Sequence, residues 1–167
     1  MDEESKKHTD NLGRLVGNMH SLEFILRAFL LNSEIQEKRQ KGLSHLPVEF
    51  SKLKQGDIIP ENAFTNYDNL GELIRKYNNH TLISSTDLTI DETLVYIRDA
   101  IAHGRVSSDN PSGPLQLLKF ERPKNNKVEV IFSVLMTEGW FKEQIIRFHD
   151  AIVKINKANE RLQNGGC

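Results

Sequence analysis

Apolar residues recur at three- and four-residue spacing near the start of the chain, which predicts a long amphipathic helix. The stripe consists of Leu12, Leu15, Val16, Met19, Leu22, Ile25, Leu26, Phe29 and Leu30. The charged segment SEIQEKRQKG at 33–42 continues the helical pattern. Gly42 is the expected end of this helix, because glycine is common just after a helix C-terminus.

A long connection and a second, shorter helix follow. Residues 43–66 contain Pro47, Gly56 and Pro60 and show no helical period, so we expect a loop, whose role the sequence leaves open. Asn66 is then expected to cap a helix. Its predicted inward residues are Tyr67, Leu70, Ile74 and Tyr77.

The sequence TIDE at 89–92 predicts the start of a third helix. In this capping-box pattern the Thr89 side chain accepts from the Glu92 amide, and the Glu92 side chain accepts from the Thr89 amide. Gly104 is expected to end the helix in a left-handed conformation. The predicted core stripe is Ile90, Leu94, Ile97 and Ile101.

The apolar period changes from helical to alternating in the region about 115–135. There LQLLKFER and VEVIFSVL flank the polar turn PKNNK, which predicts a β-hairpin. The residues expected on one side of the hairpin are Val128, Val130, Phe132 and Val134. Thr137 should then cap a last long helix. Its predicted apolar face is Phe141, Ile145, Phe148, Ile152 and Ile155.

This order of elements predicts a mainly α fold that forms a single helical domain over 1–167. We expect an up-and-down helical bundle with a small β-hairpin inserted before the last helix. Of the 167 residues, 38% are apolar and 27% are charged, which is too apolar for general disorder. The formal net charge of −1 provides no global attraction to nucleic acid, so RNA contact would need a local basic patch.

Several classes of site and location are disfavoured. The charged N-terminus MDEESKKHTD lacks the apolar core of a signal peptide, and no apolar run approaches the ~20 residues that span a bilayer. We therefore expect a cytoplasmic protein without a membrane partner. Cys167 is the single cysteine, with no assigned role, and the six histidines lack metal-ligand spacing. Neither a metal nor another cofactor is expected.

The segment RDAIAHG at 98–104 carries the candidate chemistry. At ~100° per residue, Arg98 lies at the edge of the apolar stripe, and Asp99 and His103 form an i,i+4 pair on the outward side. Arg98 and His103 diverge by about 140°, so one helix cannot bring them together. Two purely structural interpretations are available. Arg98 could extend from the core edge into solvent, and His103 could interact with the helix dipole.

A second copy of the helix would supply a functional interpretation. Two helices packed across a two-fold axis would place both pairs of Arg98 and His103 in one cleft. A neutral His103 could then accept the proton of an RNA 2′-hydroxyl, while Arg98 stabilises charge on the phosphate and Asp99 orients the imidazole. The second His103 would protonate the leaving 5′-oxygen.

The arginine, the polar residue after it and the histidine five positions beyond the arginine resemble the signature of the HEPN superfamily. Arg98, Asp99 and His103 match that signature position by position, and the helical order is compatible with the family's bundle. The resemblance implies a homodimer with a shared cleft and, in many members, metal-independent endoribonuclease activity in prokaryotic toxins or defence effectors. Other members are non-catalytic binding or dimerisation modules, with protein, nucleotide or RNA ligands.

The chain departs from the family pattern in three ways. Asp99 stands where active members very frequently have asparagine. HGRVSS lacks the tyrosine that follows the histidine in one toxin subgroup, so no antitoxin that modifies such a tyrosine is inferred. The loop at 43–66 and the hairpin at 115–135 are not general family features. A ribonuclease, a non-catalytic binding module and a scaffold in which the motif is accidental are therefore the three hypotheses.

Overall fold

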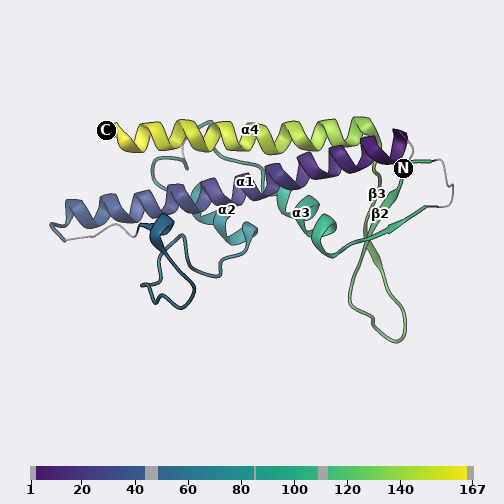
Figure 1. The fold of residues 1–167 in the computed structure, drawn as a ribbon, viewed down its shortest axis with the longest axis horizontal. Helices are drawn as coiled ribbons and strands as arrows, with labels where there is room; N and C mark the ends of the chain where they lie inside the picture. Colours follow the sequence, from purple (N-terminus) through teal and green to yellow (C-terminus); the bar gives the residue numbers. More distant parts are fainter. Residues whose placement is uncertain (1–2, 44–48, 85, 109–112, 165–167) are drawn as a thin grey trace. The chain divides into compact units, whose positions relative to one another are not determined.

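The computed structural model describes residues 3–43, 49–84, 86–108 and 113–164 (Figure 1). The chain divides into two compact units. Unit 1 comprises Met1–Leu22 and Asp91–Ile152, and unit 2 comprises Glu23–Ile90 and Val153–Cys167. Helices α1 (Glu3–Gln40) and α4 (Glu138–Gln163) contribute to both units. The fold is mainly helical, as the sequence predicts.

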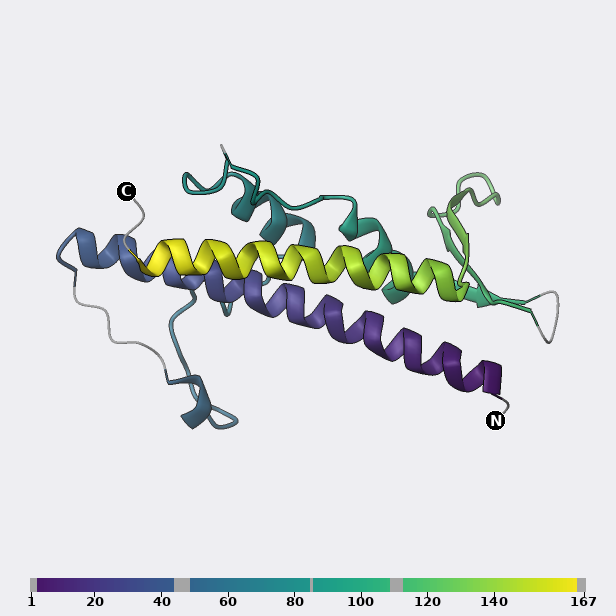
Figure 2. The same cartoon turned by 90° about the horizontal axis from the view of Figure 1, so that it is seen from above.

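Within each unit, the α1 and α4 segments lie side by side and run in the same direction (Figure 2). In unit 1 the His8 ring meets Phe141 edge-on, with 5.2 Å between ring centroids. In unit 2 the Gln36 side chain donates a hydrogen bond of 2.8 Å to the Leu162 carbonyl. Each unit therefore has its own pairing of the two long helices.

Unit 1 adds helix α3 (Leu94–His103) and a small sheet to these helices. The apolar faces of all these elements supply its core, as amphipathic patterning requires. The buried apolar residues of this unit are Leu15, Met19, Leu22, Leu94, Ile97, Ala100, Leu117, Met136, Phe141, Phe148 and Ala151. The predicted α1 stripe is largely confirmed. In α3, Ala100 is fully buried and Ile101 only half-buried.

The sheet has three antiparallel strands in the order β1 (Arg105–Ser107), β2 (Gln116–Phe120) and β3 (Val130–Leu135). The predicted hairpin corresponds to β2 and β3, which are joined through a turn where Asn125 and Asn126 have φ of 52° and 59°. Asparagine tolerates this left-handed region better than most residues, which explains its use here. The added strand β1 directly follows α3, so the sheet is larger than the predicted two-stranded hairpin.

A β-bulge changes which side chains share a face of the sheet. Lys119 pairs with Phe132, whereas the next residue, Phe120, pairs with Val130 and leaves Ile131 as the extra residue. Phe132 and Val134 therefore share one face as predicted, and both are half-buried. The prediction for Val130 is wrong, because the bulge turns it to the opposite face, where it is 50% exposed.

Unit 2 contains helix α2 (Leu70–Asn78) and the 3₁₀ helix η1 (Phe50–Lys52). The cap of α2 is Asn69, not the predicted Asn66, and its side chain accepts from the Glu72 amide in a complete capping box. Tyr67 lies before the helix and is fully exposed, so its predicted inward position is wrong. The buried apolar residues of this unit are Leu26, Phe29, Leu30, Ala63, Leu70, Leu73, Ile74, Tyr77, Ile83, Leu88, Ile90, Ile155, Ala158 and Leu162.

The remaining helix ends test four local predictions. Gly42 has φ of 68° and accompanies the end of α1, as predicted. Thr137 also caps α4 as predicted, since its hydroxyl oxygen accepts from the Trp140 amide at 3.1 Å. The Thr89–Glu92 capping box is wrong, because α3 begins after Thr93. The fourth is Gly104, for which the prediction of a left-handed residue is wrong because its φ is −74°.

No helix in the described parts of the chain is long and apolar enough to cross a membrane.

Candidate functional site

Helix α3 holds all three residues of the predicted site. Leu94, Ile97 and Ala100 anchor one side of the helix in the core of unit 1. The opposite side therefore faces outward. The Arg98 and Asp99 side chains are each 34% exposed, and His103 is exposed in the last turn.

Asp99 joins two cations from different elements. The Arg98 guanidinium donates through Nη1 to Asp99 Oδ1 at 3.3 Å, and Lys119 Nζ lies 3.6 Å from Asp99 Oδ2. We refer to Arg98, Asp99 and Lys119 as the charge cluster. With two cations and one carboxylate, the cluster carries a net charge of +1. It is a local basic feature of the kind that the chain's overall charge does not provide.

A close backbone approach brings β2 to this end of α3. A Cβ atom at Gly104 would lie 2.2 Å from the Ala100 carbonyl oxygen and 2.9 Å from that of Leu118. Glycine is therefore needed here for space and not for a positive φ. Because Leu118 immediately precedes Lys119, the same approach carries Lys119 to the helix.

The structure brings Arg98 and Asp99 together and leaves His103 apart from them. Among the residues that the structure describes, none forms a hydrogen bond or an ion pair with the His103 imidazole. We predicted that Asp99 would orient this imidazole. The Asp99 carboxylate instead contacts Arg98 and Lys119. His103 is available to solvent and to a second molecule.

Sequence reasoning did not identify Lys119. It lies 16 positions beyond His103 along the chain, in a segment predicted only as a hairpin arm. The alternation of β2 places Lys119 on the same face as Leu117, which is 2% exposed. In the sequence, this alternation is the only indication that Lys119 belongs to the site. It becomes informative only when the packing of β2 against α3 is known.

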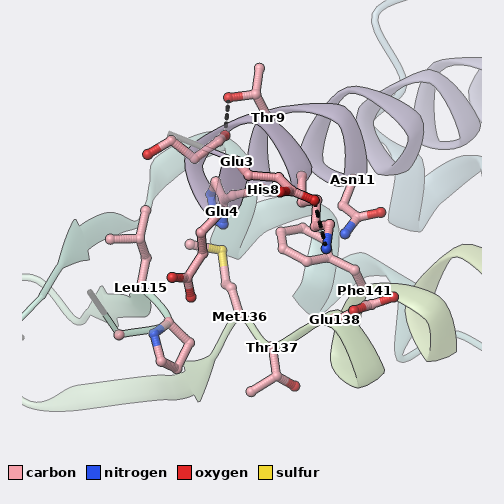
Figure 3. A pocket seen from close by; sticks show the side chains of 14 residues that line it. Glu3, Glu4, His8, Thr9, Asn11, Leu115, Met136, Thr137, Glu138 and Phe141 are labelled. Atoms are coloured by element: carbon pink, nitrogen blue, oxygen red, sulfur yellow. Dashed lines mark hydrogen bonds and ion pairs between the residues drawn. The ribbon is translucent and has the colours of Figure 1, made fainter. Parts of the chain in front are cut away.

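A second feature of unit 1 is an open hollow of about 870 Å³ at the N-terminal ends of α1 and α4 (Figure 3). Glu3, Glu4 and Glu138 contribute carboxylates to its lining, and His8 packs on Phe141. Burial lowers the pKa of His8. The acidic lining disfavours phosphate, and no residue of the charge cluster belongs to it. The hollow is therefore distinct from the candidate site.

Ser33 and His80 in unit 2 lie close enough to suggest a nucleophile and its base, with 2.7 Å between Ser33 Oγ and His80 Nε2. However, His80 Nδ1 accepts from the Leu82 amide at 3.3 Å, which places the ring proton on Nε2. Nε2 then donates to the serine oxygen and cannot accept its proton. Burial lowers the pKa of His80, with Glu37 opposing the shift, so this contact is structural.

The described residues contain no group of three or more His, Cys, Asp and Glu side chains that could hold a metal ion. Comparison of the chain with protein-family models, with curated proteins and with solved structures found no match. The charge cluster and His103 are therefore the groups on which the candidate chemistry of the site depends.

Proposed function

We propose that the protein is a metal-independent endoribonuclease of the HEPN type, which acts in the cytoplasm as a homodimer. The observation that carries the proposal is the accessible end of α3. There His103 presents an exposed imidazole in the last turn, and Arg98 presents a partly exposed guanidinium within the charge cluster, whose net charge is +1. An imidazole can move protons near neutral pH, and a guanidinium binds phosphate oxygens.

The proposed reaction is cleavage of RNA through its own 2′-hydroxyl. His103 accepts the 2′-hydroxyl proton, the 2′-oxygen attacks the adjacent phosphorus, and the bond from phosphorus to the 5′-oxygen breaks. His103 of the second copy donates a proton to that leaving oxygen. Arg98 stabilises the charge on the phosphate oxygens. The products are a 2′,3′-cyclic phosphate and a free 5′-hydroxyl.

A second copy is required because Arg98 and His103 diverge by about 140° on one helix. The exposed surface of α3 supports such a contact. Tyr96 is 65% exposed and lies seven residues before His103, within about 20° of it on the helix surface. An exposed aromatic side chain beside the imidazole is suited to packing against a second copy.

The activity test uses purified protein and single-stranded RNA in the presence of EDTA. We expect the wild-type protein to cut RNA and leave 2′,3′-cyclic phosphate ends, and His103→Ala to lose the activity by at least about a hundredfold. His149→Ala is the matched control, because His149 is also exposed in unit 1 but lies on α4. Equal residual cleavage by wild type and His103→Ala would contradict the enzyme.

The dimer is tested separately by size-exclusion chromatography with light scattering, which gives the molar mass of the protein in solution. Tyr96→Glu should give a monomer that no longer cuts RNA, because a carboxylate would be buried in the contact. Tyr67→Glu, at a fully exposed position of unit 2, should leave the dimer intact. A wild-type monomer would contradict the shared cleft.

A non-catalytic binding module is the second candidate, and one observation favours it. The Arg98 guanidinium is already paired with Asp99, which reduces the charge available to a transition state. A stable dimer that binds RNA without cutting it would support this alternative over the ribonuclease.

A further inference from the structure

We infer that Lys119 is a phosphate-binding residue of the candidate site, in which an RNA phosphate takes over the two cations that Asp99 holds. The inference rests on the proposed function for the identity of the ligand. It adds to the site a residue that lies outside the motif, in the hairpin arm β2.

In the charge cluster, two cations together bind a single anionic group that has two oxygens. Each Asp99 carboxylate oxygen faces a different cation, Arg98 at 3.3 Å and Lys119 at 3.6 Å. A phosphodiester likewise presents two oxygens that share a single negative charge. The two cations that bracket a carboxylate can therefore bracket a phosphate group in the same manner.

The position of Lys119 is not that of an ordinary surface lysine. Its side chain is only 24% exposed, although lysine is mostly found in solvent. The adjacent alternate position, Leu117, is buried on the same face of β2. The hydrocarbon stem of Lys119 thus follows the sheet surface, and its ammonium group reaches α3.

The contacts of Asp99 are weak enough to be exchanged. Both ion pairs are longer than a charge-assisted hydrogen bond of ~2.8 Å, and the Asp99 side chain is one-third exposed. Partly exposed ion pairs at these distances are screened by solvent and contribute little to stability. Lys119 and Arg98 can therefore leave Asp99 for a phosphate without disrupting the core of unit 1.

The same hairpin supplies a matched control. Lys124 and Lys127 are exposed in the turn and pair with each other through backbone atoms. Neither side chain forms an ion pair within the described part of the chain. Lys127→Gln therefore removes the same charge from the same hairpin without touching the charge cluster.

The test measures binding and not cleavage. The probe is a fluorescent single-stranded RNA carrying 2′-O-methyl groups, which cannot be cut through the 2′-hydroxyl. Anisotropy titrations at several salt concentrations would compare wild type, Lys119→Gln, Lys119→Arg and Lys127→Gln. We expect Lys119→Gln to bind roughly five- to tenfold more weakly at low salt, with a slope of log affinity against log salt less steep by about 0.7. Lys119→Arg should restore both quantities, and Lys127→Gln should match wild type.

Wild-type binding by Lys119→Gln would overturn the inference, as would an equal loss in Lys127→Gln, which would indicate general attraction to the hairpin. Failure of the inference is distinguishable from failure of the proposed function. If wild-type protein does not cut unmodified RNA but Lys119→Gln alone weakens binding, Lys119 retains its role and the ribonuclease is wrong. If wild-type protein cuts RNA and Lys119→Gln binds the probe normally, only the inference is wrong.

Discussion

Gly104 lies so close to Leu118 that a Cβ atom on the glycine would be 2.9 Å from the Leu118 carbonyl oxygen. The added atom would also meet the Ala100 carbonyl at 2.2 Å, and backbone atoms cannot rotate away as a side chain can. Gly104→Ala must therefore push α3 and β2 apart. We expect it to lower the free energy of unfolding by about 1–3 kcal/mol, measured by urea denaturation.

Gly17 offers a control with the opposite expected sign. It is exposed in α1, also in unit 1, and a Cβ there would have nothing within 4 Å. Gly17→Ala should raise the free energy of unfolding by about 0.5–1 kcal/mol, because alanine favours a helix interior. Equal behaviour of the two variants would mean that the approach of α3 and β2 does not constrain residue 104.

Local signals in the sequence predicted some helix ends of this fold and missed others. Helix ends with a strong local signal were predictable, as Gly42 and Thr137 confirm. The start of α3 was not, because Asp91 accepts from the Thr93 amide and forms a competing local turn. Strand β1 was not predicted either, since three residues are too few to establish a period.

For the candidate site, the sequence identified α3 and the divergence of Arg98 from His103. It also predicted that Asp99 lies on the outward side of the helix and contacts His103. In the structure the Asp99 carboxylate oxygens face Arg98 and Lys119 instead. The difference arises because the Lys119 contact joins a helix to a strand. Such a contact depends on tertiary packing, and no spacing rule along one element can identify it.

Arg147 connects α4 to the turn before α3. Its guanidinium donates at 2.8 Å to both Asp91 Oδ2 and Gln144 Oε1, and Gln144 is 3% exposed. Arg147→Ala would leave the buried Gln144 oxygen without this donor, so we expect a loss of about 1–2 kcal/mol in urea denaturation. Lys142→Ala removes an exposed cation from the same helix and should change stability by less than ~0.5 kcal/mol. Comparable losses in the two variants would show that helix charge, and not this contact, is responsible.

His80 makes the stability of unit 2 dependent on pH. Burial lowers its pKa in the folded protein, while the unfolded chain retains a value of about 6.5. Between those two values the unfolded state binds more protons, so stability is fully present above about pH 6.5 and decreases as the pH falls toward the folded pKa. Wild-type protein should unfold at a lower urea concentration at about pH 5.5 than at about pH 8.

His80→Gln should reduce this pH dependence without abolishing it, because burial lowers the pKa of His8 in the same direction. His149→Gln, at an exposed position, should retain the wild-type dependence. An unchanged difference between the two pH values in His80→Gln would show that burial of His80 is not a source of the pH dependence.

Asp99→Asn tests whether the carboxylate competes with phosphate, as the exchange of cations at the charge cluster requires. The substitution keeps the side-chain shape and removes the negative charge that Arg98 and Lys119 share. Repulsion between two unit charges at ~4 Å in water is about 1 kcal/mol, so the 2′-O-methyl RNA probe should bind roughly fivefold more tightly. Asp150→Asn, on the exposed side of α4, should bind as wild type does. Weaker binding by Asp99→Asn would instead show that the carboxylate is needed to position the two cations.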